Sequence, residues 1–265
     1  MIARAQVLLA EYGQFDPPFD PEKMAGLQRI IRIDRADIIF DACLLPTDGG
    51  FRVEVCKFHP RGRQTFSIGH EIGHTFLIEL EPSLGGARRE VGIPASSTAN
   101  SELVERLCNK AATELIWPTH AFLRDAWENG ASLAVVLTLA SRYKASVTAT
   151  ARRFAEVGPW RCAFILWETE TRGSTLIPKT IFRSDDAPLT ARERISARKN
   201  SQFYAALQCN HIVKGREALG PSEYPLYTES MRLGQGVISM VIFEPSPETL
   251  AARPPKRAQP FLFRL

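Results

Sequence analysis

The chain has 265 residues, enough for one large domain or two modest ones with hydrophobic cores of useful size. Hydrophobic residues make up 45% and charged residues 23%, which are ordinary globular values, and the uncharged stretch from 129 to 141 is too short to cross a bilayer. A net charge of +4 permits an acidic or nucleic-acid partner without indicating one.

The cysteines point to a reducing compartment. There are five of them, an odd number at wide spacings with no CxxC pair: Cys43, Cys56, Cys108, Cys162 and Cys209. This pattern does not build a disulfide framework. The N-terminus also lacks the apolar core of a signal peptide, because Glu11 and Tyr12 follow Met1 closely. We therefore expect a cytoplasmic protein that does not associate with membranes.

The first sixty residues predict helices and strands in a mixed order. Residues 2–12 have the pattern of a short helix ended by Gly13, and Asp20 before Pro21 predicts the capped start of another helix. Residues 29–33, 37–43 and 51–55 predict three strands. The start of the chain is therefore expected to be α+β.

The pentapeptide His70-Glu71-Ile72-Gly73-His74 carries the strongest functional signal. Two histidines four residues apart lie on the same face of a helix, where both imidazoles can reach one metal ion. Glu71 follows the first histidine by one residue, so it flanks the metal and can take a proton from a water molecule there. The pattern predicts a metal-dependent hydrolase, with His70 and His74 as ligands and Glu71 as the general base.

The residues around this motif predict a buried helix. Between Phe66 and Ile78 the only charged residue is Glu71, and a helix that is apolar nearly all round is normally buried. Gly69 and Gly73 share one face, which predicts the close approach of another backbone or of a substrate. The alternative is an ordinary buried helix with two satisfied histidines and a surface glutamate, but that alternative gives no packing reason for Glu71 at this position.

A third metal ligand is expected from a helix at residues 101–118, for which Ser101 is a plausible N-cap. Its apolar residues repeat every four positions. Glu105 and Asn109 share a face, so Glu105 can bind the metal while Asn109 accepts the second N–H of a ligand histidine. Periodicity alone leaves Glu102 and Glu114 as equally credible ligands.

The segment from Arg63 to Phe76, together with Glu105-Arg106-Leu107-Cys108-Asn109 and its continuation to Pro118, resembles the ImmA/IrrE family of zinc metallopeptidases. In that family an "RxxFxxxHExGH" helix precedes a second helix that carries a glutamate, an asparagine and a closing proline. The resemblance implies that zinc is held by His70, His74 and Glu105, and that Glu71 is the catalytic glutamate. Asn109 and Pro118 match the second helix, whereas Ala111 replaces an aromatic residue that is common there.

The same resemblance implies the architecture and the substrate. It predicts a zincin-like metallopeptidase domain at residues 1–128. By analogy with metallopeptidases as a class, an edge strand of its sheet would hold an extended substrate by backbone hydrogen bonds. The implied substrate is a helix-turn-helix transcriptional repressor, whose cleavage would release stress-response or mobile-element genes.

Residues 129–158 predict two short helices, the second capped by Ser146. They resemble a helix-turn-helix, and Arg152 and Arg153 could meet DNA phosphates. We favour the alternative of a helical hairpin that completes the core or docks a protein, because two adjacent arginines are weak evidence for DNA contact. Longer members of the resembled family also carry a segment of this kind.

Residues 159–265 predict a second α+β domain. The apolar runs 162–167 and 237–243 are typical of central strands, and two shorter strands, 175–177 and 180–182, flank Pro178. The charged stretch 191–200 predicts a solvated helix, and residues 254–257 a loose tail. Resemblance to long family members implies a GAF-like sensor module, although no ligand motif is visible in this half.

Two other functions remain as alternatives to a zinc endopeptidase. One is a regulator that binds DNA through residues 131–157, and the other is a zinc-stabilised sensor that binds its partner without cutting it. Neither role requires a general base, so Glu71 favours the enzyme. A group that stabilises the oxyanion should also exist, and His59, His120 and Tyr143 are suitable by type, but the sequence assigns none of them.

Overall fold

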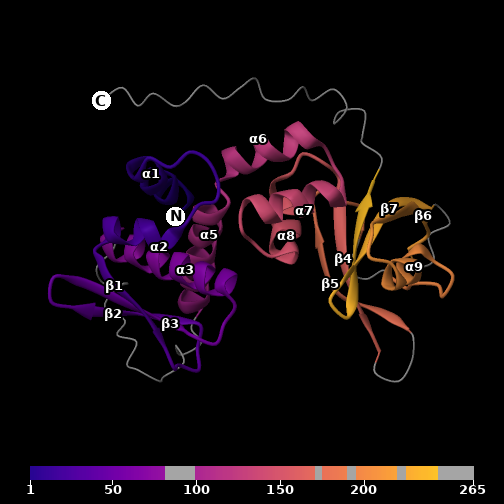
Figure 1. Ribbon diagram of the computed structural model, residues 1–265. Helices are drawn as coiled ribbons and strands as arrows, with labels where there is room; N and C mark the ends of the chain where they lie inside the picture. Colours follow the sequence, from indigo (N-terminus) through magenta and orange to yellow (C-terminus); the bar gives the residue numbers. More distant parts are fainter. Residues whose placement is uncertain (81–98, 171–174, 190–194, 220–224, 244–265) are drawn as a thin grey trace. The chain divides into compact units, whose positions relative to one another are not determined.

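A computed structural model describes residues 1–80, 99–170, 175–189, 195–219 and 225–243. The chain divides into two compact units. The first comprises residues 1–122 and 141–145, and the second comprises residues 123–140 and 146–265. Helices and two sheets confirm the α+β class (Figure 1). No helix among these residues is long and apolar enough to cross a membrane.

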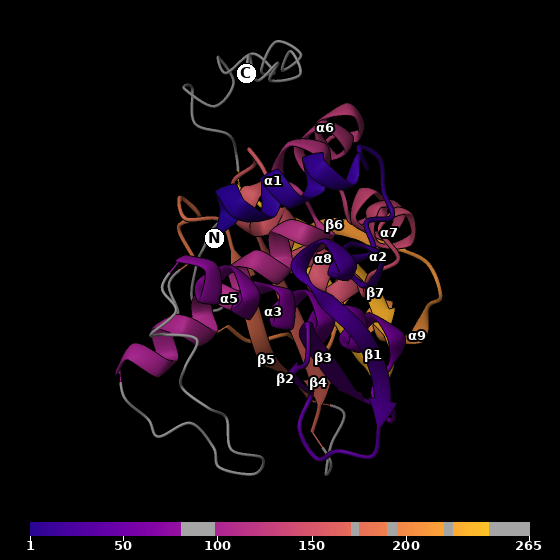
Figure 2. The ribbon, with the colours of Figure 1, turned by 90° about the vertical axis from the view of Figure 1, so that its left-hand side faces the viewer.

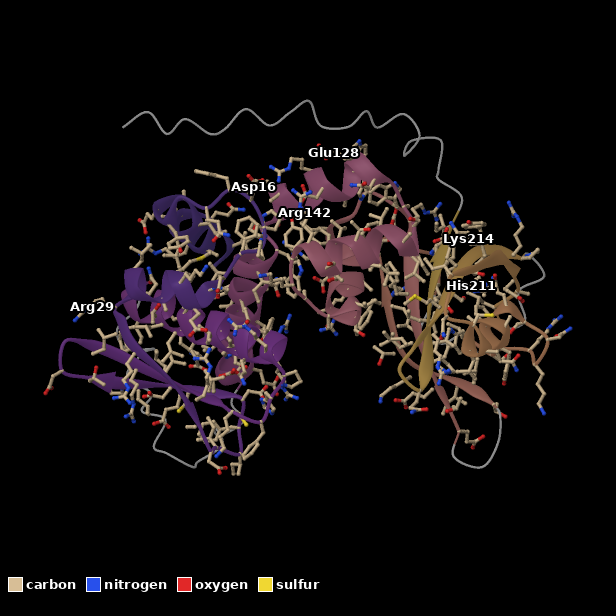
Figure 3. The ribbon with its side chains drawn as sticks, in the orientation of Figure 1. Asp16, Arg29, Glu128, Arg142, His211 and Lys214 are labelled. Atoms are coloured by element: carbon tan, nitrogen blue, oxygen red, sulfur yellow. The ribbon has the colours of Figure 1, made fainter. Side chains whose placement is uncertain are left out.

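The N-terminal unit begins with α1 (Ile2–Tyr12), α2 (Pro21–Met24) and the 3-10 helix η1 (Ala25–Gln28). Two predicted boundaries are confirmed: Gly13 ends α1 in the left-handed conformation at φ 73°, and the Asp20 side chain accepts a hydrogen bond from the Glu22 N–H at the start of α2. Arg29, also at positive φ, turns the chain from η1 into the sheet and points outward (Figure 3).

The first sheet contains β1 (Ile30–Ala36), β2 (Ala42–Thr47) and β3 (Gly50–Cys56) in the order β1-β3-β2. The first and third predicted strands are confirmed, but the second was placed too early, at 37–43. Strand β2 contains Pro46, and local sequence rules disfavour proline inside a strand. Pro46 is tolerated because β2 is an edge strand and the backbone of residue 46 faces the open edge, away from β3. The missing N–H of proline therefore costs no hydrogen bond between the two strands.

Two long helices, α3 (Arg61–Leu80) and α5 (Ala99–Ile116), lie side by side in both views (Figures 1 and 2). The prediction for Gly69 and Gly73 is confirmed. A Cβ at Gly69 would lie 3.2 Å from the Ala112 Cα, and a Cβ at Gly73 would lie 2.9 Å from the Cys108 Cα. The two glycines therefore let the backbone of α5 approach the histidine-bearing helix.

The helix α5 begins at Ala99, two residues before Ser101, so the predicted N-cap position was wrong. At its other end, Pro118 separates α5 from α6 (Thr119–Asn129). The N-terminal core is built from buried apolar residues of α1, α3 and α5. It also includes Tyr143, which packs against the rings of Phe19 and Phe122.

The C-terminal unit is built on a five-stranded sheet in the order β5-β4-β8-β7-β6, in which all the pairings are antiparallel. Its strands are β4 (Cys162–Thr169), β5 (Leu176–Arg183), β6 (Val213–Glu217), β7 (Leu226–Leu233) and β8 (Gly236–Ile242). Helix α8 (Val147–Val157) packs on β4 and β5, and α9 (Gln202–Gln208) packs on β6, β7 and β8. Helix α7 (Leu133–Arg142) is tied to the sheet by a buried carboxylate, since the Leu133 N–H donates to Glu229 Oε2.

The helices α7 and α8 and the Ser146 cap agree with the predicted helical pair, because the Ser146 hydroxyl accepts from the Ala149 N–H. The central strands β4 and β8 also agree. The two strands predicted on either side of Pro178 are one strand, β5, where Pro178 is tolerated at a sheet edge. Residues 195–200 are not helical, and the rest of the predicted helix 191–200, like the tail 254–257, lies outside the described residues.

Candidate metal centre

The two histidines of α3 point toward one another. Their Nε2 atoms lie 3.2 Å apart, and the ring centroids are 5.0 Å apart. This is the consequence of a spacing of four residues on one helix face. Both side chains are mostly buried, with exposures of 13% for His70 and 19% for His74.

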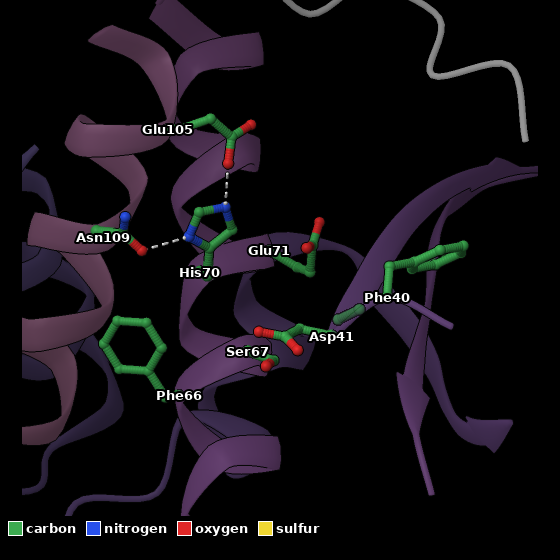
Figure 4. A pocket seen from close by; sticks show the side chains of 9 residues that line it. Phe40, Asp41, Phe66, Ser67, His70, Glu71, Glu105 and Asn109 are labelled. Carbon is green, nitrogen blue, oxygen red and sulfur yellow. Dashed lines mark hydrogen bonds and ion pairs between the residues drawn. The ribbon is translucent and has the colours of Figure 1, made fainter. Parts of the chain in front are cut away.

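Helix α5 brings a carboxylate to the same point. Glu105 Oε2 lies 3.1 Å from His70 Nε2, and Glu105 Oε1 lies 3.7 Å from His74 Nε2 (Figure 4 shows the His70 contact). Tetrahedral zinc with bonds of about 2.0–2.1 Å spaces neighbouring ligand atoms roughly 3.3 Å apart. The three donors converge at separations of 3.1–3.7 Å, so the residues fit a zinc ion.

Asn109 lies one turn after Glu105 and holds the other nitrogen of His70. Its Oδ1 is 3.0 Å from His70 Nδ1, so that Nδ1–H can donate to the amide and Nε2 keeps its lone pair for a metal. Burial alone lowers the pKa of His70, but the hydrogen bond to Glu105, the charges of Glu71 and Glu105, and the bond to Asn109 outweigh it. The pKa of His70 is therefore raised above its ordinary value, because the surroundings are negative and favour a cation.

Glu71 is 2% exposed and lines a pocket of about 320 Å³ together with His70, Glu105 and Asn109. Five further residues line the pocket that sequence reasoning did not assign to the site: Phe40, Asp41, Ala42, Phe66 and Ser67. Phe66 and Ser67 lie one helical turn before His70, so helix periodicity could have found them. Ala42 is the first residue of β2, and Phe40 and Asp41 lie in the connection just before it, where the sequence had predicted a strand.

The alternative ligands are placed differently. Glu114 is 1% exposed and accepts hydrogen bonds from Gln6, the Thr119 N–H and the Thr119 hydroxyl, so it caps α6. Glu102 is exposed, and neither glutamate lines the pocket. Of the three glutamates that the sequence left open, only Glu105 meets the histidines.

Cys108 is a further donor that the sequence did not suggest. Ligand atoms of His70, His74 and Cys108 all lie within 4.8 Å of one another. We favour Glu105 over Cys108 as the third ligand, because Glu105 reaches both Nε2 atoms and lines the pocket. Cys108, in contrast, is fully buried against Gly73.

None of the three residues suggested for the oxyanion lines this pocket. Tyr143 is buried between aromatic rings of the core, and His120 is exposed on α6. His59 comes nearest, because its Nδ1 lies 3.3 Å from Asp41 Oδ1, and Asp41 lines the pocket.

Two histidines and a glutamate on paired helices beside a small mixed sheet are typical of zincin-like metallopeptidases. Comparison with known families agrees. Residues 55–155 match the Peptidase_M78 family, described as the IrrE N-terminal-like domain. This segment of the chain is similar to the IrrE N-terminal-like domain of a peptidase family, and the resemblance to ImmA/IrrE proteins is confirmed.

A similar solved structure is described as a Mycobacterium tuberculosis transcriptional regulator. The TM-score is 0.60 at 16% sequence identity, and the match covers 91% of this chain and 75% of that chain. Identity this low establishes a shared fold and nothing about shared chemistry. Comparison with curated proteins gives no match.

The ligand set leads to a first prediction. Purified protein is expected to bind about one zinc ion per chain, and changing His70, His74 or Glu105 to alanine is expected to reduce occupancy sharply, because catalytic zinc relies on three protein ligands. Cys108→Ala is the matched control and should retain zinc. Metal analysis measures occupancy. A thiolate charge-transfer band in the cobalt-substituted protein, lost in Cys108→Ala, would instead make Cys108 a ligand.

Proposed function

We propose that the protein is a cytoplasmic zinc-dependent endopeptidase that cleaves a helix-turn-helix transcriptional repressor and so switches on stress-response or mobile-element genes. One observation carries the enzymatic part. His70, His74 and Glu105 converge at metal-ligand separations, and the buried Glu71 lines the same pocket. The peptidase family of residues 55–155 supports it.

Each residue of the site has its own role in the proposed hydrolysis. Zinc, when bound, would polarise the scissile carbonyl and lower the pKa of a water molecule toward 7. Glu71 would take the proton of that water and later deliver it to the leaving amine. Asn109 would keep His70 in the tautomer that presents Nε2, through the 3.0 Å contact with Nδ1.

The edge strand β2 suits an extended substrate. The Cys56 N–H donates to the Asp41 carbonyl, and hydrogen-bonded positions alternate along an antiparallel pair. The backbone groups of Ala42 and Leu44 therefore face the open edge, as does the carbonyl of Pro46, which has no N–H to offer. Since Ala42 lines the pocket, a peptide paired with β2 would pass directly into the site.

This pairing predicts a pattern of sensitivity along the substrate backbone. N-methylation of a substrate peptide at alternate residues should weaken cleavage by about five- to ten-fold each, because each methyl removes a hydrogen bond to Ala42 or Leu44. The intervening residues should tolerate the methyl group. Comparing kcat/KM across a series of singly methylated peptides measures this, and uniform sensitivity would contradict pairing with β2.

A direct test uses the helix-turn-helix repressor encoded beside this protein, where there is one. Incubation with the zinc-loaded protein should cut that repressor at one site, as read by mass spectrometry of the fragments. Chelation of the metal should abolish the cut. Loss of the repressor without a defined cleavage site, or a cut that survives chelation, would argue against a zinc endopeptidase.

The alternative is a non-cleaving zinc-stabilised regulator that acts by binding DNA or protein. The solved structure of similar fold, described as a transcriptional regulator, favours it. Two observations on helix α8 argue against DNA contact. The Arg152 guanidinium lies over the Phe182 ring, 4.8 Å from its centroid, and Arg153 is only 8% exposed. Both arginines that could have met phosphates are engaged with their own unit.

We therefore expect no specific DNA complex at physiological salt. If α7 and α8 did bind DNA, affinity would fall steeply with salt and with the double change Arg152→Ala and Arg153→Ala. A gel-shift titration with operator DNA measures this. A nanomolar, sequence-specific complex that needs these arginines would establish the regulator in place of the enzyme.

The C-terminal unit is proposed to be the sensor half, of GAF-like type. Its antiparallel sheet carries α8 against Phe164 on one face and α9 against Trp167 on the other, because alternate residues of β4 point to opposite faces. The face that carries α9 has its own cluster of buried apolar residues, which includes Ile165, Trp167 and Phe203. Lys214 of β6, labelled in Figure 3, lies 2.9 Å from the buried Glu229 that also caps α7.

A further inference from the structure

The metal-binding pocket has a part that the metal chemistry does not use. Once His70, Glu71, Glu105 and Asn109 are assigned to the centre, the remaining walls are Phe40, Asp41, Ala42, Phe66 and Ser67. In Figure 4, Phe40 lies on the strand side of the pocket, beyond Glu71. A substrate side chain next to the scissile bond would enter this space.

The charges around the strand side are already paired. Arg63 Nη2 lies 2.8 and 3.1 Å from the two carboxylate oxygens of Asp41, and His59 Nδ1 lies 3.3 Å from one of them. In the same loop, Asp37 lies 3.1 Å from Lys57 Nζ. These pairs are exposed and contribute little to stability, but they offset the charges of Asp37 and Asp41 on this side of the pocket.

The same loop exposes apolar surface. Ile39 is fully exposed and Phe40 is 37% exposed, although large apolar side chains are usually covered. Adjacent exposed apolar residues at the rim of a pocket mark a surface that another molecule covers. Phe40 belongs both to this exposed apolar surface and to the pocket, because its side chain is partly exposed and also lines the pocket wall.

We propose that Phe40 determines specificity, forming with Ala42 an apolar subsite on the strand side of the pocket for a leucine- or phenylalanine-like side chain adjacent to the scissile bond. This inference rests on the proposed function. An aliphatic or aromatic side chain would displace water from Phe40 without meeting an unpaired charge. A lysine or glutamate there would lose hydration, and Asp41, the charged residue on this side of the wall, is already held by Arg63.

The proposal can be tested by binding alone, with small hydroxamates that attach to the zinc of the loaded protein. Acetohydroxamate reports the metal, and N-acetyl-leucine and N-acetyl-lysine hydroxamates add one side chain each. Calorimetry should find the leucine compound about ten-fold tighter than the lysine compound, which is about 1.4 kcal/mol. Phe40→Ala should reduce this preference to within about three-fold and leave acetohydroxamate binding unchanged.

Phe58→Ala is the matched control, since Phe58 is 69% exposed but does not line the pocket, and it should keep the full preference. Equal affinity of the wild type for the leucine and lysine compounds would overturn the proposal. Tighter binding of the lysine compound would also overturn it, because Asp41 would then be the residue that selects the side chain. An unchanged preference in Phe40→Ala would overturn it as well. Failure of the proposed function would give a different result from failure of the subsite, because acetohydroxamate would then not bind or the repressor would not be cut.

Discussion

Glu71→Gln is expected to lower repressor cleavage by roughly two to four orders of magnitude while zinc content and fold are kept. A positioned general base contributes typically 10²–10⁴-fold, and glutamine has almost the same shape as glutamate but cannot accept the proton. Glu71 lies beside His70 in sequence and is 2% exposed in the pocket wall, where bulk water is a poor substitute for the lost base. Single-turnover cleavage rates measure the effect directly.

Glu102→Gln is the matched control, because Glu102 is an exposed glutamate on the neighbouring α5 and should keep the full rate. The Glu71→Gln protein should still bind the repressor, since recognition would rest on other surfaces. In cells, induction of the target genes by Glu71→Gln at the wild-type level would show that proteolysis is not the mechanism. The zinc site would then have only a structural role, stabilising the fold.

The metal centre was largely predictable because its geometry is local. A spacing of four on one helix brings His70 and His74 together whatever the rest of the chain does. The same holds for Glu105 and Asn109 on α5, but which glutamate of that helix meets the histidines depends on how α5 packs on α3. Resemblance to a family selected Glu105, and no pattern in the chain could have done so.

The strand side of the pocket wall was not predictable, since it depends on contacts between segments far apart in the sequence. Phe40 and Asp41 were assigned to a strand, whereas they belong to the connection before β2. Prolines caused two further errors, because Pro46 and Pro178 lie inside strands that local rules would interrupt. Both strands are at sheet edges, and an edge position can be recognised only once the order of the strands is known.

The approach of α5 to α3 is expected to depend on Gly73 more than on any other glycine of the helix. A Cβ at Gly73 would lie 2.9 Å from the Cys108 Cα and 3.2 Å from its carbonyl oxygen, both backbone atoms that no rotamer change can move. Gly73→Ala should therefore force the helices apart and destabilise the protein by about 1–3 kcal/mol, as overpacking does. Because Glu105 and Asn109 flank Cys108 on α5, zinc affinity should fall as well.

Gly62→Ala is the matched control in the same helix. Nothing lies within 4 Å of a Cβ at Gly62, so alanine should stabilise α3 there by about 0.5–1 kcal/mol, through higher helix propensity alone. Gly69→Ala should fall between the two, because its Cβ would lie 3.2 Å from the Ala112 Cα. Denaturant midpoints and zinc titrations of the three variants measure this order. If Gly73→Ala were as stable as Gly62→Ala and kept its zinc affinity, the close contact of the two helices would not be what brings Glu105 to the histidines.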